Sequence, residues 1–478
     1  MNYDNYDVVV GLEIHTELST NTKAYCGCKN SFGAEVNSQC CEICAALPGT
    51  LPLMNEETVK RAIKLGLALN CNITNVSRFD RKHYFYPDLS KGYQITQDKF
   101  PICTNGHLDV LVGDCVKKIG ITRIHMEEDT AKLIHDNSFS GTLIDFNRGG
   151  VPLLEIVSDP DIRSAEEAKA FLETIKQILV YLDVSDAKMQ EGSIRCDVNV
   201  SVNKKGAKEF GTRIEMKNVN TFSGAVRAIE YESKRQIDIL ESGGTLSQET
   251  RRWDDANGTN TLMRSKENAL DYMYFPDPDL GNVLVTDEFV DSVKKSLPEL
   301  PNIKVIRYMN EYGLPSYDAG LLVEDKARAM FFEKCVSIRN CTPKNISNWL
   351  LGDITRILRE KEISLSESKL TPENLCDMIK LIEDKTISNA AGKTIIEIII
   401  DDDRTVQSIV DEKGLAQISD SSALEAIVDK VIADNETAIA QYKDGKTNVL
   451  GFLVGQCMKN SKGSGNPGIM KELLLKKI

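Results

Sequence analysis

The feature that most constrains the fold is a carboxylate inside an apolar run. Residues 151–157 read VPLLEIV, so Glu155 falls within a segment that predicts a buried strand. Burying a lone carboxylate is costly unless a cation or a hydrogen-bond donor pairs with it. Residues 119–124 alternate like a neighbouring strand, and Glu127 and Glu128 follow them. Because Mg²⁺ takes hard oxygen ligands, the stretch predicts either a magnesium site or a core glutamate bonded to an arginine beside a solvated acidic turn.

The N-terminal segment adds two candidate ligands. Residues 7–18 alternate as a strand, which places Glu13 and His15 on one face. Two such side chains can share a ligand, although an exposed strand edge has the same pattern. All five histidines lie within the first 135 residues, which points to chemistry in the N-terminal part of the chain.

Two close thiol pairs predict a structural zinc site. Cys26 and Cys28 are followed by Cys41 and Cys44, which is the spacing of a zinc knuckle, with Cys40 as an ambiguous fifth sulfur. The chain has 478 residues and 13 cysteines, an odd number, which favours free thiols and a metal site over a disulfide framework. The alternative for the four residues is a set of buried thiols without a metal.

Two further strands and a basic segment offer phosphate-binding groups. Residues 196–202 and 212–219 alternate as strands with charged polar faces, and residues 248–254, QETRRWD, add adjacent arginines. Such a sheet face could hold ATP, but a ladder of cross-strand ion pairs would look the same. The candidate phosphate-binding residues are Arg195, Arg213, Lys217, Arg251 and Arg252.

The order of the elements predicts an α+β domain followed by helices. Strand-rich sequence with helices near residues 55–69 and 223–241 extends to residue 293. Helical apolar spacing prevails from residue 294 to 403, and short helices with glycine-rich breaks occupy residues 404–478.

The C-terminal end is basic in an otherwise acidic chain. Residues 442–478 carry seven lysines and two acids, a balance of 7 − 2 = +5, whereas the whole chain has a net charge of −13. The acidic total argues against RNA binding over the whole surface, so an RNA contact must use a local patch. Lys446, Lys459 and Lys462 are the candidates for contacts with RNA phosphates, and a solvated face is the alternative.

Longer motifs resemble a known family. They are VVVGLEIH (8–15), FDRKHYFYPDLSKGYQITQ (79–97), GITRIHMEED (120–129), PLLEIVSDPDIRS (152–164), EGSIRCDVNVS (191–201), QETRRWD (248–254), YMYFPDPDL (272–280) and GFLVGQCMK (451–459). In these motifs, and over nearly the whole chain, the sequence is similar to GatB, the family of B subunits of the glutamyl-tRNA(Gln)/aspartyl-tRNA(Asn) amidotransferases. The resemblance implies a glutamine synthetase-like cradle domain at 1–293 that contains the zinc knuckle, an all-α helical domain at 294–403, and a small YqeY-like tRNA-binding tail at 404–478.

The resemblance also implies a reaction. ATP phosphorylates the side-chain carboxylate of Glu or Asp misacylated onto tRNA(Gln) or tRNA(Asn), and ammonia then attacks the acyl phosphate. The chain has no amidase motif of its own, so a glutaminase subunit, GatA, and a small subunit, GatC, are expected as partners in a heterotrimer. Matched position by position, the resemblance assigns Mg²⁺ to His15, Glu128 and Glu155, with Glu13 and Glu127 beside them as catalytic residues.

Two other functions fit parts of the sequence. One is a zinc-knuckle RNA-binding protein without catalysis, against which the acidic cluster argues because carboxylates repel RNA. The other is a free-standing ATP-dependent amide ligase for a small amino acid, which needs no basic helical tail. The sequence leaves open whether Glu-tRNA(Gln), Asp-tRNA(Asn) or both are used. Residues 1–7, MNYDNYD, lack the basic and apolar parts of a signal peptide, so a cytoplasmic location is expected.

Overall fold

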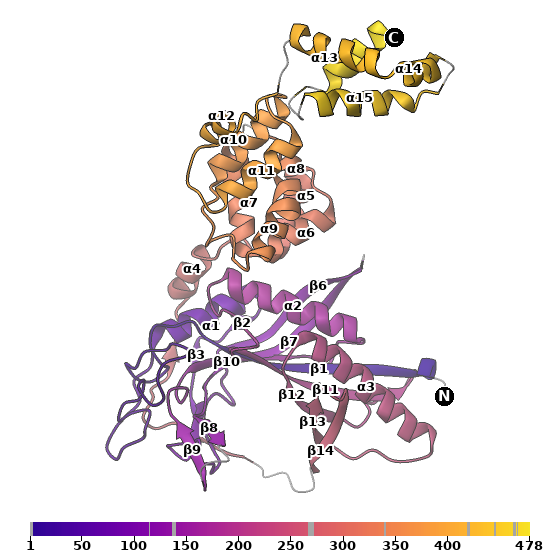
Figure 1. The fold of residues 1–478 in the computed structure, drawn as a ribbon. Helices are drawn as coiled ribbons and strands as arrows, with labels where there is room; N and C mark the ends of the chain where they lie inside the picture. The colour runs from indigo at the N-terminus through magenta and orange to yellow at the C-terminus, as the bar shows by residue number, and fades with distance from the viewer. Residues whose placement is uncertain are drawn as a thin grey trace. The chain divides into compact units, whose positions relative to one another are not determined.

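The structure divides into two units, Met1–Leu300 and Pro301–Ile478 (Figure 1). It is a computed structural model, and it describes residues 3–113, 115–135, 140–265, 272–338, 341–417, 421–443, 446–461, 465 and 467–478. The first unit is mixed α/β and the second is helical. Within the described residues, no helix is both long enough and apolar enough to span a membrane.

One large sheet organises the first unit, which begins with a short 3-10 turn, η1 (Tyr3–Asn5). Its strands are β1 (Tyr6–Glu17), β2 (Asn72–Ile73), β6 (Cys103–Val112), β7 (Cys115–Glu128), β10 (Pro152–Ser158), β11 (Ile194–Lys204), β12 (Ile214–Val219), β13 (Glu249–Asp254) and β14 (Thr259–Ser265). Their spatial order is β14-β13-β12-β11-β1-β10-β7-β6-β2. Neighbours are antiparallel except β12 and β13, which are parallel. β1 therefore lies in the middle of the sheet, between β11 and β10.

Long helices cover one face of this sheet (Figure 1). They are α1 (Glu56–Ala68), α2 (Ala165–Tyr181) and α3 (Phe222–Glu241). Each begins at a capping side chain that accepts a hydrogen bond from a backbone N–H of the first turn; these residues are Asn55, Ser164 and Thr221. Caps of this kind satisfy amides that have no partner inside the helix.

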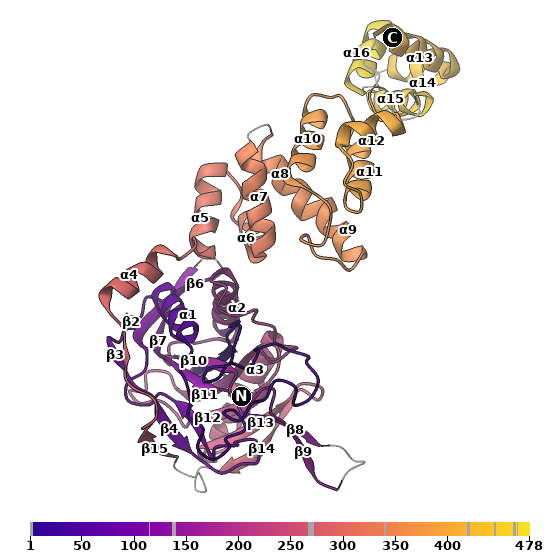
Figure 2. The ribbon, with the colours of Figure 1, turned by 90° about the vertical axis from the view of Figure 1, so that its left-hand side faces the viewer.

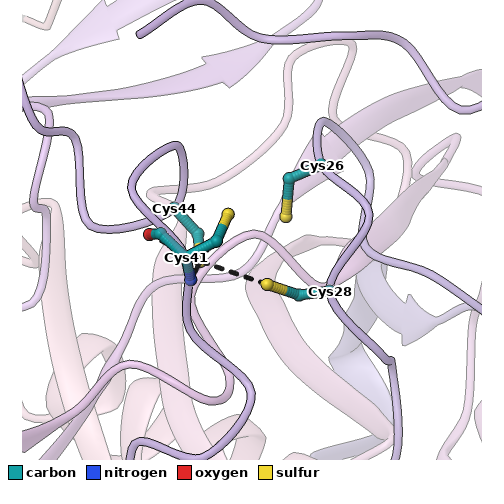
Figure 3. Close-up of side chains that lie close together, drawn as sticks. All are labelled: Cys26, Cys28, Cys41 and Cys44. Atoms are coloured by element: carbon teal, nitrogen blue, oxygen red, sulfur yellow. Dashed lines mark hydrogen bonds between the residues drawn. The ribbon is translucent and has the colours of Figure 1, made fainter.

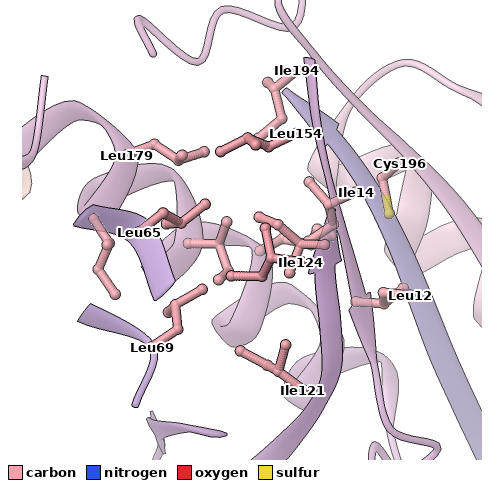
Figure 4. Packing of buried hydrophobic residues seen from close by; sticks show 14 of the residues in the cluster. Leu12, Ile14, Leu65, Leu69, Ile121, Ile124, Leu154, Leu179, Ile194 and Cys196 are labelled. Carbon is pink, nitrogen blue, oxygen red and sulfur yellow. The ribbon is translucent and has the colours of Figure 1, made fainter. Parts of the chain in front are cut away.

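The apolar core lies between these helices and the sheet (Figure 4). Leu12 and Ile14 of β1 point into it together with Leu154 of β10, and all three are almost fully buried. Because side chains alternate along a strand, Glu13 and His15 lie on the opposite face of β1. The helix-covered face therefore supplies stability, and the other face carries polar side chains.

Small sheets flank the large one. They are β15-β4-β5, formed by Met273–Pro276, Asp80–His83 and Tyr93–Thr96; β16-β3, formed by Val283–Leu284 and Val76–Ser77; and β8-β9, formed by Lys132–His135 and Thr142–Asp145. Strands β15 and β4 pair although they are far apart in the chain. Arg81 reinforces this pairing, since its Nε donates to Asp277 at 2.8 Å and its Nη2 to Asp279 at 2.5 Å.

The remaining elements are helices (Figure 2). They are α4 (Asp287–Lys295) in the first unit and, in the second, α5 (Pro301–Tyr312), α6 (Ser316–Glu324), α7 (Lys326–Ile338), α8 (Pro343–Trp349), α9 (Thr355–Glu360), α10 (Pro372–Glu383), α11 (Asn389–Ile399), α12 (Val406–Lys413), α13 (Ser421–Asp434), α14 (Glu436–Lys443), α15 (Val449–Asn460) and α16 (Pro467–Lys477). A π-helical turn, η3 (Leu350–Ile354), follows α8.

Helices α13, α15 and α16 enclose an apolar cluster of their own. Its buried residues are Leu424, Val428, Val431, Leu453, Cys457, Met470, Leu473 and Leu474. The mixed first unit and the helical second unit agree with the fold class expected from the sequence at this coarse level. The two units divide after Leu300, whereas the sequence pattern predicted a boundary at residue 293, and the boundary at residue 403 stays a prediction.

Candidate active site

A histidine and two glutamates converge on the face of the large sheet opposite the helices. His15 of β1 pairs directly with Glu155 of β10, and Glu155 pairs with His125 of β7. Glu127 lies two residues beyond His125, on the same side of β7. The Nδ1 atom of His15 is 3.0 Å from Oε1 of Glu127 and 3.8 Å from Oε2 of Glu155. One ligand atom from each of His15, Glu127 and Glu155 lies within 4.8 Å of the other two.

Burial and opposite charge determine the electrostatics of this group. Burial alone would lower the pKa of His15, but its hydrogen bond to Glu127 and the charges of Glu127 and Glu155 raise it to about 9. Burial would raise the pKa of Glu155, but the charges of His125 and His15 hold it well below its usual range. The two imidazoles thus favour the charged form of Glu155.

The donor set fits a divalent cation. His125 is almost fully buried, with its Nε2 3.3 Å from Oε2 of Glu155, and its Nδ1 has no hydrogen-bond partner among the described residues. The Nε2 atom is the nitrogen that faces the cluster, so His125 adds a second imidazole beside Glu155. Two carboxylates and an imidazole leave further coordination positions for water and phosphate oxygens, as Mg²⁺ requires.

Glu128 lies apart from this group. Its Oε1 is 2.5 Å from Nζ of Lys91 and accepts a hydrogen bond from the backbone N–H of Ile95 at 3.0 Å. Neighbouring residues on a strand point to opposite faces, so Glu127 and Glu128 cannot join the same cluster by simple alternation. The structure therefore brings His15 and Glu155, both predicted as ligands, together with Glu127. The metal-binding role of Glu128 stays a prediction.

A second acidic group surrounds Glu13 on the same face. Glu13 pairs with Asp197 across β1 and β11, and one ligand atom from each of Glu13, Asp197 and Glu215 lies within 4.8 Å of the others. Lys217 enters this group, with its Nζ 2.5 Å from Asp197 and 3.0 Å from Glu215. Burial, and then repulsion by Glu155, raise the pKa of Glu13. The lysine makes one cross-strand ion pair, with Asp197 of β11, and such pairing was the alternative that the sequence left open for this sheet face.

The predicted phosphate-binding cations occupy different positions. Arg213 is exposed and lines a cavity of about 260 Å³ together with Glu13. Arg195 donates to Asp129 at 2.7 Å, and Arg251 donates to Glu249 at 2.7 Å. Arg252 is exposed on β13. Arg213 and Lys217 are thus the two candidates that lie next to Glu13.

The four predicted zinc ligands also come together (Figure 3). One sulfur from each of Cys26, Cys28, Cys41 and Cys44 lies within 4.8 Å of the others. The Cys28–Cys44 and Cys41–Cys44 sulfur distances are 4.0 and 3.9 Å. A tetrahedral zinc with Zn–S bonds of about 2.3 Å requires sulfurs about 3.8 Å apart, so the donor set fits zinc.

Two neighbours adjoin the cysteine cluster. The sulfur of Cys40 lies 3.8 Å from that of Cys44, so a fifth thiol borders the four. The fully buried Lys23 places its Nζ 3.6 Å from Cys44 and 3.0 Å from the carbonyl oxygen of Phe146. A hydrogen bond from Cys26, together with Lys23, lowers the pKa of the Cys44 thiol to about 4.

The lysines proposed for RNA lie in the second unit. Lys446 precedes α15 and Lys459 lies in its last turn, and both are exposed. The twelve residues of α15 span about 18 Å, so the two lysines lie at opposite ends of this helix. Lys462 lies outside the described residues.

Comparison with known proteins identifies the family. Residues 8–291 match the GatB/GatE catalytic domain, and residues 330–478 match the GatB domain. The B subunit of the aspartyl/glutamyl-tRNA(Asn/Gln) amidotransferase from Caldicellulosiruptor bescii is 51% identical over 476 residues, with 99% of each chain covered. The corresponding B subunits from Caldanaerobacter subterraneus and Clostridium acetobutylicum are each 50% identical, again with 99% of each chain covered. The resemblance noted in the sequence is confirmed: the chain belongs to the family of B subunits of the aspartyl/glutamyl-tRNA(Asn/Gln) amidotransferases.

Proposed function

We propose that this chain activates the side-chain carboxylate of Glu or Asp esterified to tRNA and converts it to the amide. A carboxylate is a poor electrophile, so an oxygen of the side chain first attacks the γ-phosphorus of ATP, and ADP leaves. Ammonia then attacks the carbonyl carbon of the acyl phosphate, and inorganic phosphate leaves. The products are Gln-tRNA(Gln) or Asn-tRNA(Asn). Full-length similarity to amidotransferase B subunits supports this function over a free-standing small-molecule ligase or a non-catalytic RNA-binding protein.

The observation that carries the proposal is the convergence of His15, Glu127 and Glu155 on one sheet face. These residues would hold Mg²⁺, which offsets the charge of phosphate oxygens during phosphoryl transfer. His125 orients Glu155 through its contact at 3.3 Å. The long strands fix these positions, and such preorganisation is what electrostatic catalysis requires.

The neighbouring groups on this face are assigned to the nucleotide. Arg213 lines the cavity beside Glu13, where its guanidinium can fork onto phosphate oxygens. Lys217 holds Asp197 and Glu215 in place and is a second cation within reach of the same region. Glu13 completes the polar face next to Glu155. The first unit would thus act as the glutamine synthetase-like cradle for ATP and the aminoacyl end of the tRNA.

The other parts of the reaction need partners. The sequence contains no amidase motif, so ammonia comes from a glutaminase subunit, GatA, with GatC as the small third subunit. The exposed Lys446 and Lys459 favour the C-terminal segment as a tRNA contact. The cysteine cluster would hold a structural zinc that fixes the loop between β1 and α1.

A transamidation assay of the purified three-subunit complex tests the proposal. Glu155→Gln keeps the shape of the side chain but removes its charge, so Mg²⁺-dependent transamidation should fall at least about 10²-fold. Glutaminase activity in the partner serves as the internal control and should survive. The complex is assayed with Glu-tRNA(Gln) and with Asp-tRNA(Asn) separately, which also decides the substrate. Unchanged transamidation by Glu155→Gln across a Mg²⁺ titration would overturn the assignment.

A further inference from the structure

We propose that Lys82 binds the phosphoryl group during its transfer, first as the γ-phosphate of ATP and then as the acyl phosphate. The inference deepens the function proposed above and rests on it. Lys82 lies on β4, in the small sheet β15-β4-β5, and not on the large sheet that supplies the carboxylates. It would therefore contact the phosphoryl group from the side opposite the carboxylates.

Strand register places Lys82 on the face that looks toward the acidic group. Lys82 lies directly opposite Gln94 of β5 and Tyr274 of β15. Directly opposed residues in a sheet share a face. The Nε2 of Gln94 lies 3.3 Å from Oε2 of Glu127 and donates at 2.7 Å to the backbone oxygen of Glu128. The face that carries Lys82 is thus the one in contact with Glu127.

Two tyrosines hold the ammonium in place. Its Nζ lies 4.7 Å from the ring centroid of Tyr272 and 6.0 Å from that of Tyr84. The two rings pack edge to face, with centroids 5.5 Å apart. A lysine ammonium over an aromatic face is attracted by the ring quadrupole, more strongly where water is partly excluded. Lys82 is half-buried, so the rings position its charge while leaving its hydrogen-bond donors available.

Lys82 has no carboxylate partner within 4 Å in the part of the chain that the structure describes. Two other cations of this region do have such partners: Arg81 pairs with Asp277, and Lys91 pairs with Glu128. A half-buried cation near a carboxylate cluster, without a counter-ion of its own, is suited to an anionic ligand that binds between them.

The proposed reaction supplies the anion, which is the phosphoryl group that passes from ATP to the substrate. With Mg²⁺ bound, its charge and those of the two carboxylates Glu127 and Glu155 would sum to 2 − 2 = 0, which would leave the charge of the transferred group uncompensated. In the step itself, the bond from γ-phosphorus to the bridging oxygen of ADP breaks while the bond to the substrate carboxylate oxygen forms. Lys82 transfers no proton. It supplies a fixed positive charge to the phosphoryl oxygens, for which a lysine ammonium is well suited.

The test uses the three-subunit complex, ATP and Glu-tRNA(Gln) or Asp-tRNA(Asn), whichever it amidates. The readout is aminoacyl-tRNA-dependent ADP formation with added ammonium salt, whose ammonia consumes the acyl phosphate as it forms. Lys82→Met should lower kcat at least about 10²-fold, and Lys82→Arg should recover part of this loss because it restores the charge. Lys99→Met is the matched control, since Lys99 is exposed in the same unit, and it should behave as the unaltered complex.

A second pair of variants tests the positioning by aromatic rings. Tyr272→Phe keeps the ring and should retain nearly full kcat, whereas Tyr272→Leu should lower it about tenfold because the cation–π contact is lost. If Lys82→Met does not fold, the two Tyr272 variants still test whether the positioned ammonium of Lys82 contributes to kcat. Equal kcat for the Tyr272 variants, or for Lys82→Met and Lys99→Met, would overturn the inference. If Lys82→Met and Glu155→Gln are both fully active, the proposed function fails together with the role of Lys82. If Lys82→Met is fully active and Glu155→Gln is inactive, only the role of Lys82 is wrong.

Discussion

The acidic cluster and the cysteine cluster are both candidate metal sites, but the chain builds them in opposite ways. The acidic cluster takes His15, Glu127 and Glu155 from three strands that are far apart in sequence. The cysteine cluster takes its sulfurs from a single loop, residues 26–44, between β1 and α1. The strands hold the acidic cluster whether or not a cation is bound, whereas the loop has little regular structure to hold the thiols together.

The two clusters also differ in how their charge is compensated. Lys23 lies against Cys44 as a buried cation, with its side chain fully enclosed. The acidic cluster has imidazoles beside its carboxylates, and one of them, His125, has a nitrogen without a hydrogen-bond partner in the described part of the chain. A preformed cluster of this kind is suited to catalysis, and a loop that a metal closes is suited to stability. Variants of the two clusters should therefore differ in their effect on transamidation.

The largest effect is expected for the carboxylate that completes the acidic cluster. Glu127→Gln should lower transamidation by 10²- to 10³-fold, or roughly 2.7–4 kcal/mol of transition-state stabilisation. Glu128→Gln should act mainly on thermal stability, because it breaks the ion pair with Lys91. The measurement is kcat of the complex with both variants, read beside their thermal midpoints. A larger loss of kcat in Glu128→Gln would support Glu128 as the metal ligand and argue against Glu127 in that role.

The cysteine cluster should affect activity only through folding. The Cys26→Ser/Cys41→Ser double variant should lose the zinc, close to one ion per chain, that metal analysis of the unaltered complex is expected to give. Its thermal midpoint should fall because metal-binding free energy contributes to folding. At temperatures where the complex stays folded, transamidation should fall by less than about tenfold. Finding no zinc in complex prepared without chelators would favour the interpretation as free thiols.

The cysteine cluster joins residues that are close in the chain, and the acidic cluster joins residues that are far apart. This difference explains which features could be predicted from the sequence. The cysteines are close in the chain, so their spacing alone predicted the cluster that the structure brings together. Alternation placed His15 with Glu13 on one face, and α1 and α3 begin and end close to the predicted residues. Placing Glu127 beside His15 and Glu155 needs the β7–β10 register, in which Glu155 faces His125, two residues from Glu127. The pairing of β4 with β15 determines which face carries Lys82, and it joins segments too far apart in the chain for any local sequence pattern to predict it.

A smaller effect is expected at the buried cation of the cysteine cluster. Lys23→Met keeps most of the apolar stem and removes the charge beside Cys44. Because that charge helps to lower the thiol pKa, the variant should bind zinc about tenfold more weakly, the size typical of groups that contact a metal ligand. The measurement is a chelator competition on the complex, with Lys29→Met as a control on the same loop. Equal zinc affinity in the two variants would show that Lys23 supports only packing.

The smallest effect is expected at the lysine-rich C-terminal end. Like the cysteine spacing, this feature can be seen within one short stretch of the sequence. If Lys446 and Lys459 contact tRNA phosphates, changing each to Gln should make the plot of log affinity against log salt concentration less steep. The slope should change by roughly 0.7–0.9 for each contact that is lost. Lys477→Gln is the matched control, because its ammonium already pairs with Asp429 at 2.6 Å in the same segment. ATP affinity should not change in any of the three variants, since the proposed nucleotide groups all lie in the first unit.

The experiment is a salt titration of tRNA binding to the complex, with ATP affinity measured for the same variants. Equal slopes for all three variants and the unaltered complex would place the tRNA contact elsewhere. The basic C-terminal end would then be a solvated surface, and its positive charge would not indicate RNA binding.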